Sequence, residues 1–231
     1  MGRRRIEGLR REEVAAAAGI SVDYYTRLEQ GRERNPSDGV VNALARVLRL
    51  GPDATRHLVH LRDSRHATAV HRAFDAGLTE RLSTLVDSVA PNPAYVLDRL
   101  SFMTAANTEG LALFEGFADL APDQRNTCRY LFTDPRAREV FVEWEVVARG
   151  AVAHLRAANS DDLGSPDLRG LVDELASQSE HFQSWWSEHV VERRRASVAR
   201  VRTSQGVVAR RYEVLHLPDD DLRVTLWLPS A

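Results

Sequence analysis

The sequence predicts two domains, an all-α domain with a helix-turn-helix at the N-terminus and an α+β domain after it. Short segments with helical apolar stripes fill the first 63 residues, whereas thirteen of the sixteen aromatic residues lie after position 90. Strand-forming segments stand at both ends of the second part, with helical segments between them. This order is typical of one antiparallel sheet with helices inserted between strands 2 and 3. A length of 231 residues also suits two domains better than one.

The most informative segment is residues 9–36, LRREEVAAAAGISVDYYTRLEQGRERNP. Gly19 can adopt the left-handed conformation that ends a helix, and Ser21 can cap the next helix by accepting a backbone N–H bond. Gly31 then leads into a loop that carries arginines. This layout is that of a helix-turn-helix, in which the second helix enters the DNA major groove. The apolar stripes of the two helices contain Leu9, Val14, Ala15, Ala18, Tyr25 and Leu28.

The second helix of this motif presents a polar and aromatic set outward, as a DNA-reading helix needs. Arginine can bind guanine through two hydrogen bonds, aspartate can accept from the cytosine amino group, and valine can touch a thymine methyl group. The alternative interpretation is an ordinary helical hairpin of a bundle. The outward residues are Val22, Asp23, Tyr24, Arg27 and Gln30.

Two further helices are expected to complete the first domain. The segment NPS (35–37) breaks the helical pattern, and Ser37 can cap a helix after it. Gly51-Pro52-Asp53 ends that helix and begins a fourth. We therefore expect a helical domain over 1–63, followed by a polar, weakly periodic linker over 64–78.

The second domain, 79–231, is expected to begin with a helix near 79–89 and two short strands at 94–97 and 102–106. The last three strands of the chain are joined by short turns, which predicts an antiparallel meander. We expect all five strands in one sheet, with helices covering one of its faces. The remaining elements are a helical centre over 108–189, broken at 121–123, 134–135 and 159–166, and strands over 196–202, 207–217 and 222–228.

Composition excludes several classes of protein. All 31 basic residues are arginine, so chemistry that needs a lysine, such as a P-loop or a Schiff base, is excluded. We expect no membrane span and no secretory signal, because no apolar run is long enough for either. The single Cys128 excludes an internal disulfide, fits a reducing cytoplasm and is expected to be a buried, inert thiol.

The net charge of −2 is unevenly distributed. Residues 1–75 carry 14 arginines against 10 acidic residues, or +4, while residues 76–231 carry −6. The basic part coincides with the helix-turn-helix, as a phosphate-binding surface needs. No HExxH, GxSxG, CxxC or glycine-rich phosphate pattern occurs, so we expect neither an enzyme nor a cofactor. His57 and His60 suit a solvated helix face better than a metal site, because no third ligand is evident.

Both domains resemble a known family. The first is similar to the Cro/repressor-type (XRE) helix-turn-helix in the segments GLRREEVA (8–15), AGISVDYYTRLEQGR (18–32), NPS (35–37) and ALARVLRL (43–50). The second resembles the MmyB-like, PAS-type ligand-binding domain found in one branch of that family. Its matching segments are NPAYVLDRL (92–100), RNTCRYLFTDPRAR (125–138), EWEVVARGAVAHLRA (143–157), LRGLVDELASQSEHFQSWWSEHVV (168–191) and YEVLHLPDDD (212–221).

The chain departs from the family pattern in three places. Family members normally have a whole helix before GLRREEVA, whereas only MGRRRIE precedes it here. Either the start of the sequence is placed too late, or the first helix of the domain is missing. Ala106-Asn107 stands where the family usually has a tryptophan-asparagine pair. The run Arg193–Arg195 replaces a segment that usually bears glycine.

For the first domain, the resemblance implies a residue-by-residue interface with DNA. The residues carried over to the base edges are Val22, Asp23, Tyr24 and Arg27. Those carried over to the phosphates are Arg11, Ser21, Gln30, Arg32 and Arg34.

For the second domain, the resemblance implies a sensor that holds a small hydrophobic or fatty-acid-like ligand between sheet and helices. Aromatic side chains could line such a cavity, although any one of them is more often plain core. Arginine binds a carboxylate through two parallel hydrogen bonds, so Arg125, Arg129, His181 and His189 are candidate carboxylate anchors. The expected ligand site contains Phe102, Phe114, Arg129, Phe132, Phe141, Trp144, Phe182, Trp185, Tyr212 and Trp227.

Together these features predict a cytoplasmic bacterial transcription regulator that binds a double-stranded DNA operator as a homodimer. Two reading helices would then address half-sites one DNA turn apart, roughly 34 Å. Two alternatives stay open. The C-terminal domain could serve dimerisation without a ligand, or an incomplete DNA-binding domain could bind a protein partner instead.

Overall fold

The computed structural model describes residues 9–33, 35–63, 76–203, 206–217 and 221–229. The chain forms two compact units, Met1–Ala67 and Thr68–Ala231, which we call the N-terminal and C-terminal units. The first is helical and the second combines helices with an antiparallel sheet, which confirms the predicted fold class. None of the described helices is both long and apolar enough to cross a membrane.

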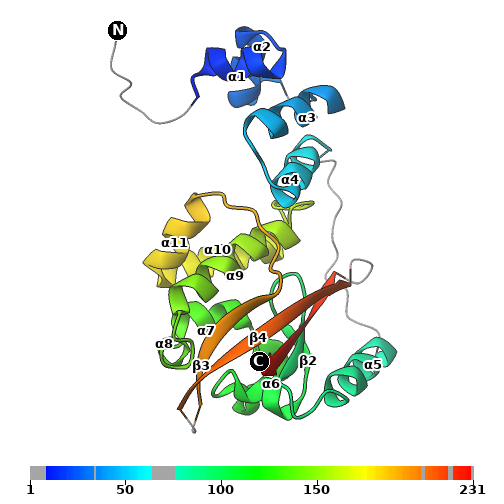
Figure 1. The fold of residues 1–231 in the computed structure, drawn as a ribbon, viewed down its shortest axis with the longest axis vertical. Helices are drawn as coiled ribbons and strands as arrows, with labels where there is room; N and C mark the ends of the chain where they lie inside the picture. Colours follow the sequence, from blue (N-terminus) through cyan, green and yellow to red (C-terminus); the bar gives the residue numbers. More distant parts are fainter. Residues whose placement is uncertain (1–8, 34, 64–75, 204–205, 218–220, 230–231) are drawn as a thin grey trace. The chain divides into compact units, whose positions relative to one another are not determined.

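Four helices form the described part of the N-terminal unit, as predicted (Figure 1). The first ends at Gly19, whose φ of 69° is left-handed. Ser21 caps the second helix by accepting the N–H of Tyr24, and Ser37 caps the third by accepting that of Val40. The helices are α1 (Arg11–Ala18), α2 (Val22–Glu29), α3 (Asp38–Val47) and α4 (Pro52–Asp63).

The core of the N-terminal unit lies between α1 and α3. Its buried apolar residues are Val14, Ala15, Val41, Leu44 and Ala45. Leu9, predicted to belong to the first apolar stripe, is instead 55% exposed. It precedes Arg10, the extended residue that caps α1, and so it lies outside the helix. The predicted absence of an earlier helix concerns residues 1–8, which lie outside the described residues.

The C-terminal unit begins with α5, which starts at Ala76, so residues 76–78 are helical and do not belong to a linker. The rest of the predicted linker lies outside the described residues. The elements of this unit are α5 (Ala76–Asp87), β1 (Ala94–Leu97), β2 (Met103–Ala106), α6 (Thr108–Ala112), η1 (Phe117–Asp119), η2 (Pro122–Gln124), α7 (Thr127–Thr133), α8 (Arg136–Val140), α9 (Trp144–Ala158), α10 (Pro166–Gln178), α11 (Glu180–Ser187), β3 (Ser197–Thr203), β4 (Gly206–Leu217) and β5 (Leu222–Pro229).

One five-stranded sheet organises the C-terminal unit, in the order β2-β1-β5-β4-β3. All of its pairings are antiparallel, and β3, β4 and β5 follow one another as the predicted meander. β1 pairs with β5, and Tyr95 lies opposite Thr225. The two ends of the domain's sequence therefore meet in the middle of its sheet.

The inner face of the sheet, as we call it, packs against α6 to α11 and forms the main core. Directly paired residues of neighbouring strands share a face of the sheet. Tyr212 and Trp227, which are paired, are both buried in this core. The paired residues Leu97, Arg223 and His216 lie on the same inner face.

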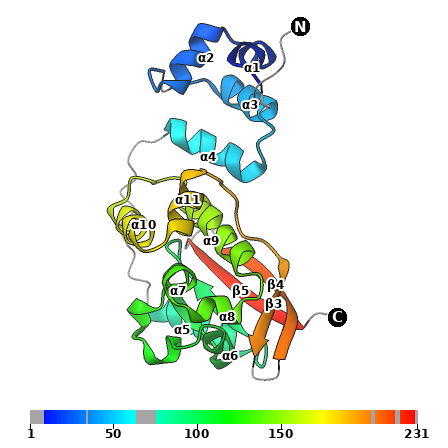
Figure 2. The same cartoon turned by 90° about the vertical axis from the view of Figure 1, so that its left-hand side faces the viewer.

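The opposite face, the outer face, is partly covered by α5. In Figure 1, α5 lies on the other side of β2 from α7 and α8, and Figure 2 shows α7, α8 and α9 on the inner side of β3 and β4. The expectation that helices cover only one face is therefore wrong. Leu82 and Val86, one helical turn apart on α5, pack against Val96 of β1 and Val224 of β5. β1 is apolar on both faces, so it requires a cover on both.

The buried amide of Asn107 joins four segments of this unit. Its Oδ1 accepts from the N–H groups of Ala94 at 2.9 Å and Gly110 at 2.8 Å. Its Nδ2 donates to the carbonyls of Val86 at 3.0 Å and Asn92 at 2.8 Å. The end of α5, the turn after it, the start of β1 and the start of α6 are thereby fixed to one side chain.

Replacing Asn107 with alanine should destabilise the C-terminal unit by about 4 kcal/mol, because four buried backbone groups lose their partner and each such bond contributes ~1 kcal/mol. Urea unfolding followed by circular dichroism measures the loss. Gln183→Ala, on the exposed surface of α11, is the control and should change stability by less than about 0.5 kcal/mol. Equal stability of the two variants would show that the Asn107 bonds do not hold the unit together.

Candidate functional site

The exposed surface of α2 carries the residues predicted to read DNA bases. Val22 is 40% exposed, and Asp23 and Arg27 are exposed as well. Arg27 lies 3.3 Å from Asp23 and its guanidinium lies 5.8 Å from the centre of the Tyr24 ring. The structure thus brings these four residues together on one helix. An exposed ion pair contributes little, so Arg27 can exchange Asp23 for another partner at low cost.

The residues predicted to contact phosphate have different surroundings. Arg11 forms an ion pair with Glu29, with 2.5 Å between Nε and Oε2, and so ties α1 to α2. The Ser21 hydroxyl is engaged in the helix cap. Gln30 and Arg32 are exposed just after α2. The last of this group, Arg34, lies outside the described residues.

The residues predicted to hold a ligand do not form one lining. Four of them, Phe114, Phe141, Tyr212 and Trp227, gather against the inner face of the sheet. Phe141 and Tyr212 both lie against Trp227, with ring centres 6.4 and 5.0 Å away. Three of them, Phe114, Phe141 and Trp227, border a small internal cavity of about 20 Å³, enough for a single water molecule.

A second group of predicted ligand residues packs between α7, α9 and α11. Phe132 lies 5.1 Å from Phe182 and 6.0 Å from Trp185 between ring centres, both edge to face. The indole N–H of Trp144 donates to the carbonyl of Leu131 at 2.7 Å. The rings thus pack against one another and the indole N–H has an acceptor within the protein, which favours a packing role for this group.

The predicted carboxylate anchor Arg129 already has a carboxylate partner. Its guanidinium donates two hydrogen bonds to Glu174, each 2.8 Å long. It also lies 5.3 Å from the centre of the Phe102 ring, beside an open surface hollow. Because its charge is compensated and the hollow is open to solvent, Arg129 does not suit a buried headgroup site. The other predicted anchors do not line the internal cavity either; they are Arg125, His181 and His189.

Two arginines that sequence reasoning missed do line the internal cavity, Arg194 and Arg223. Arg223, on the inner face of β5, is only 5% exposed. It donates to the main-chain carbonyl of Asp98 at 3.3 Å and to the Ser101 hydroxyl at 3.0 Å, both uncharged acceptors. Burial lowers the pKa of Arg223 to about 10, and the nearby charge of Arg194 contributes to the shift. Within the described part of the chain, this buried charge donates to uncharged acceptors, and the nearby carboxylate of Asp98 only partly offsets the effect of burial on its pKa.

The signal for Arg223 was present in the sequence. In a strand, residues two apart share a face. Arg223 therefore shares a face with Thr225 and with Trp227, which was itself predicted to line the ligand site. For Arg194 the signal was the run Arg193–Arg195, one of the three departures from the family pattern.

Two histidines hold the backbone of Arg194 in place. Its N–H donates to Nδ1 of His154 at 3.0 Å, and its carbonyl lies 3.0 Å from Nε2 of His216. The two imidazole rings are stacked with centres 5.6 Å apart. The Arg194 side chain in turn lies over Tyr212, 5.2 Å from the ring centre.

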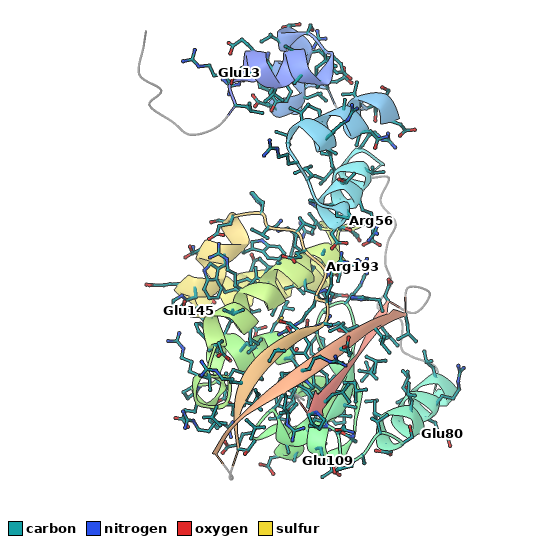
Figure 3. All side chains as sticks on the ribbon, in the orientation of Figure 1. Glu13, Arg56, Glu80, Glu109, Glu145 and Arg193 are labelled. Carbon is teal, nitrogen blue, oxygen red and sulfur yellow. The ribbon has the colours of Figure 1, made fainter. Side chains whose placement is uncertain are left out.

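Arg194 borders both the internal cavity and a groove on the surface. A surface groove of about 420 Å³ is bordered by Arg194 together with Val146, Val190 and Tyr212. Arg194 is the side chain that borders both this groove and the internal cavity. In Figure 3 the neighbouring Arg193 is labelled and marks the connection between α11 and β3 that carries these arginines.

No metal or thiol chemistry is evident among the described residues. No group of three or more histidine, cysteine or acidic residues in this part of the chain is arranged to hold a metal ion. Cys128 is buried and unoxidised, as expected. Burial raises the pKa of its thiol, which keeps it in the unreactive form.

The buried His154 predicts an acid-sensitive C-terminal unit. Burial, followed by the charges of Arg223, His216, Arg194 and Arg193, holds its pKa well below the usual 6.5. As the pH falls, the unfolded chain therefore binds a proton at His154 before the folded chain does. The stability that is present above pH 6.5 is lost below it, by up to about 1.4 kcal/mol per pH unit. His154→Asn, which keeps an acceptor for Arg194, should show a shallower loss in urea unfolding. The exposed His181→Asn should follow the wild type, and identical slopes for all three proteins would contradict this origin.

Comparison with known families agrees with this architecture. A helix-turn-helix domain family matches residues 2–58. No curated protein matches the chain significantly. The family described as the MmyB-like transcription regulator ligand binding domain matches residues 78–231, which is the larger part of the chain. The recognition made from sequence is thereby confirmed, and the chain belongs to the MmyB-like transcription regulators.

Proposed function

We propose that this regulator reads a DNA operator through α2, as a cytoplasmic homodimer, and responds to a hydrophobic ligand with an acidic headgroup. The observation that carries the ligand class is the cavity on the inner face of the sheet, where aromatic rings and two arginines meet. The helix-turn-helix in the same chain supports DNA as the target of the response.

The surface of α2 supports direct reading of bases. Its N-terminal turn is fixed by the Ser21 cap, so Val22, Asp23 and Arg27 are presented from a rigid helix. Arginine and aspartate recognise guanine and cytosine in the major groove, and each such contact contributes about 1–3 kcal/mol of discrimination. Arg32, which follows the helix, suits a phosphate contact that carries no sequence information.

These roles predict different effects of two alanine substitutions on DNA binding. Arg27→Ala should remove the preference for the operator over scrambled DNA, because a base contact is lost. Arg32→Ala should weaken binding to every sequence and lower the salt dependence by about one counterion. Fluorescence anisotropy at several salt concentrations, using DNA upstream of the protein's own gene, distinguishes these effects. Arg169→Ala, an exposed arginine of α10, is the control, and an equal loss on all sequences for both test variants would refute the assigned roles.

The paired arginines favour a carboxylate over a neutral headgroup. Arg223 is buried and donates to the main-chain carbonyl of Asp98 and to the Ser101 hydroxyl, both uncharged acceptors. Arg194 borders the same cavity, held by a ring contact with Tyr212. A carboxylate placed between the two guanidinium groups would accept charge-assisted hydrogen bonds and offset the buried charge. The apolar body of the ligand would lie against Phe114, Phe141 and Trp227.

Ligand entry requires a rearrangement at Arg194. Ligand pockets usually have volumes of about 300–1,000 Å³, far more than the cavity between the aromatic rings. The surface groove has a suitable volume and shares the lining residue Arg194 with that cavity. Movement of the Arg194 side chain away from Tyr212 would join the two spaces. The proposed ligand thus replaces an arginine–aromatic contact with an arginine–carboxylate contact.

A headgroup comparison tests this site. Decanoic acid should raise the thermal midpoint of the wild type and bind about tenfold more tightly than decanol, because a charged hydrogen bond contributes about 1.5–3 kcal/mol. In Arg223→Gln the advantage of the acid should disappear, whereas Arg129→Gln should retain it. Equal binding of acid and alcohol by the wild type would refute the two-arginine anchor.

The small internal volume also favours a second candidate, a regulator whose C-terminal unit binds no ligand and serves only dimerisation. The cavity of about 20 Å³ is fully consistent with a packed core. The same experiment decides between the candidates. If neither decanoic acid nor decanol binds, and native mass spectrometry of freshly purified protein shows no retained apolar compound, the ligand-free candidate is preferred.

A further inference from the structure

Half of the outer face of the sheet has no cover among the described residues. α5 packs over β2, β1 and β5 and contacts the outer side chains of those strands. On β3 and β4 most outer side chains are exposed, and no described helix of the C-terminal unit lies in front of these strands in Figure 1. Glu213 is half-buried, and so is Leu217, which packs at the border of the α5 cluster. The most exposed apolar residues there are Val198 at 60%, Val207 at 47% and Leu215 at 61%. The register places these residues singly among charged ones, with Val198 beside Arg211 and Val207 beside Arg202, so the case for an interaction surface rests on the pattern of β4.

The outer residues of β4 follow a symmetric pattern. Register with β3 and β5 places alternate residues of β4 on this face. In chain order they are Val207, Ala209, Arg211, Glu213, Leu215 and Leu217. Two opposite charges thus stand at the centre, with two apolar residues on each side. Reversal of the strand direction leaves the apolar positions unchanged and exchanges the positive charge with the negative one.

We propose that the uncovered outer face of β3 and β4 is the dimer interface, with a second copy of this chain as its partner. In a two-fold interface, residue i of one copy meets residue j of the other, and j meets i. A two-fold axis between the sheets that crosses β4 at Tyr212 brings Arg211 of each copy opposite Glu213 of the other. Leu215 then meets Ala209, and Leu217 meets Val207.

The charges also select this arrangement over its alternative. An axis parallel to β4 would place Arg211 opposite Arg211 and Glu213 opposite Glu213, and like charges that face each other are unfavourable. Within one chain, Arg211 and Glu213 lie 3.2 Å apart with their side chains 56% and 36% exposed. An exposed ion pair of this kind contributes little to stability. Replacing it with the same ion pair between two copies of the chain therefore costs little free energy.

The outer edge of β3 is a less suitable contact than the face of the sheet, because its backbone groups are engaged. The N–H of Arg200 donates to the carboxylate of Glu143, and its carbonyl accepts from the N–H of Val142. Phe141 and Val201 form a further bridge at this edge. A strand whose edge groups are bonded, and which carries arginines, resists the addition of another strand. Two sheets can instead pack face to face, with a separation of about 10 Å.

Charge exchange tests the interface on the full chain by light scattering after size exclusion. The wild type should have twice the chain mass of 25.9 kDa. Arg211→Glu and Glu213→Arg should each be monomeric, because each places like charges in contact across the axis. A mixture of the two variants should again show the doubled mass, and so should the variant that carries both substitutions. Thermal unfolding of each variant confirms that it is folded.

Leu215→Glu should also give a monomer, whereas Val146→Glu, at a 72% exposed position of α9, should remain dimeric. This inference rests on the homodimer of the proposed function, and the results distinguish a failure of this interface from a failure of the homodimer itself. A wild type with the mass of one chain would overturn both. A dimeric wild type whose single-charge variants are equally dimeric would overturn only this surface, and so would a mixture that stays monomeric. DNA and ligand binding, measured separately on the wild type, test the remaining parts of the proposed function.

Discussion

The C-terminal unit depends on the four hydrogen bonds of one buried amide. Asn107 fixes the end of α5, the turn after it and the start of β1, and it also caps α6. These bonds leave little freedom in how α5 meets β1. They bring α5 across the outer face of β2, β1 and β5, and so determine which half of that face is covered. The position of one asparagine thereby shapes both the core and the surface that stays exposed.

Much of the secondary structure could be predicted from local signals. The run VTLWL is rich in residues that favour strands, and Ser21 and Ser37 precede helices that they cap in the structure. The position of α5 could not be predicted in this way. It depends on the pairing of Tyr95 with Thr225, far apart in sequence, which determines the face that remains to be covered. Periodicity within a segment gives no information on such a pairing.

The candidate ligand site was predictable in composition but not in arrangement. Aromatic residues were correctly expected in the core, yet residue type alone could not show that Phe132 and Trp227 lie in different clusters. Arg129 was a reasonable anchor by chemistry, but Glu174, on another helix, already binds it. Arg223 was not predicted, because the strand-forming character of its segment does not show which of its residues face the core. The environment of an arginine is decided by its partners across the sheet, which sequence does not display.

In the proposed function and the proposed dimer, strand β4 connects ligand binding, dimerisation and DNA binding. Tyr212 points inward, where Arg194 lies over its ring, while its neighbours Arg211 and Glu213 point outward to the dimer interface. A ligand that displaces Arg194 acts on β4 at the point where the two-fold axis crosses it. Ligand binding and dimer geometry are then linked, and linkage is reciprocal: a ligand that favours one dimer arrangement is itself bound better by that arrangement. Couplings of this kind are typically about 1–3 kcal/mol, or about 5- to 150-fold in affinity. Because two reading helices must match half-sites about 34 Å apart, a small change in the packing of the two sheets is sufficient to alter operator binding.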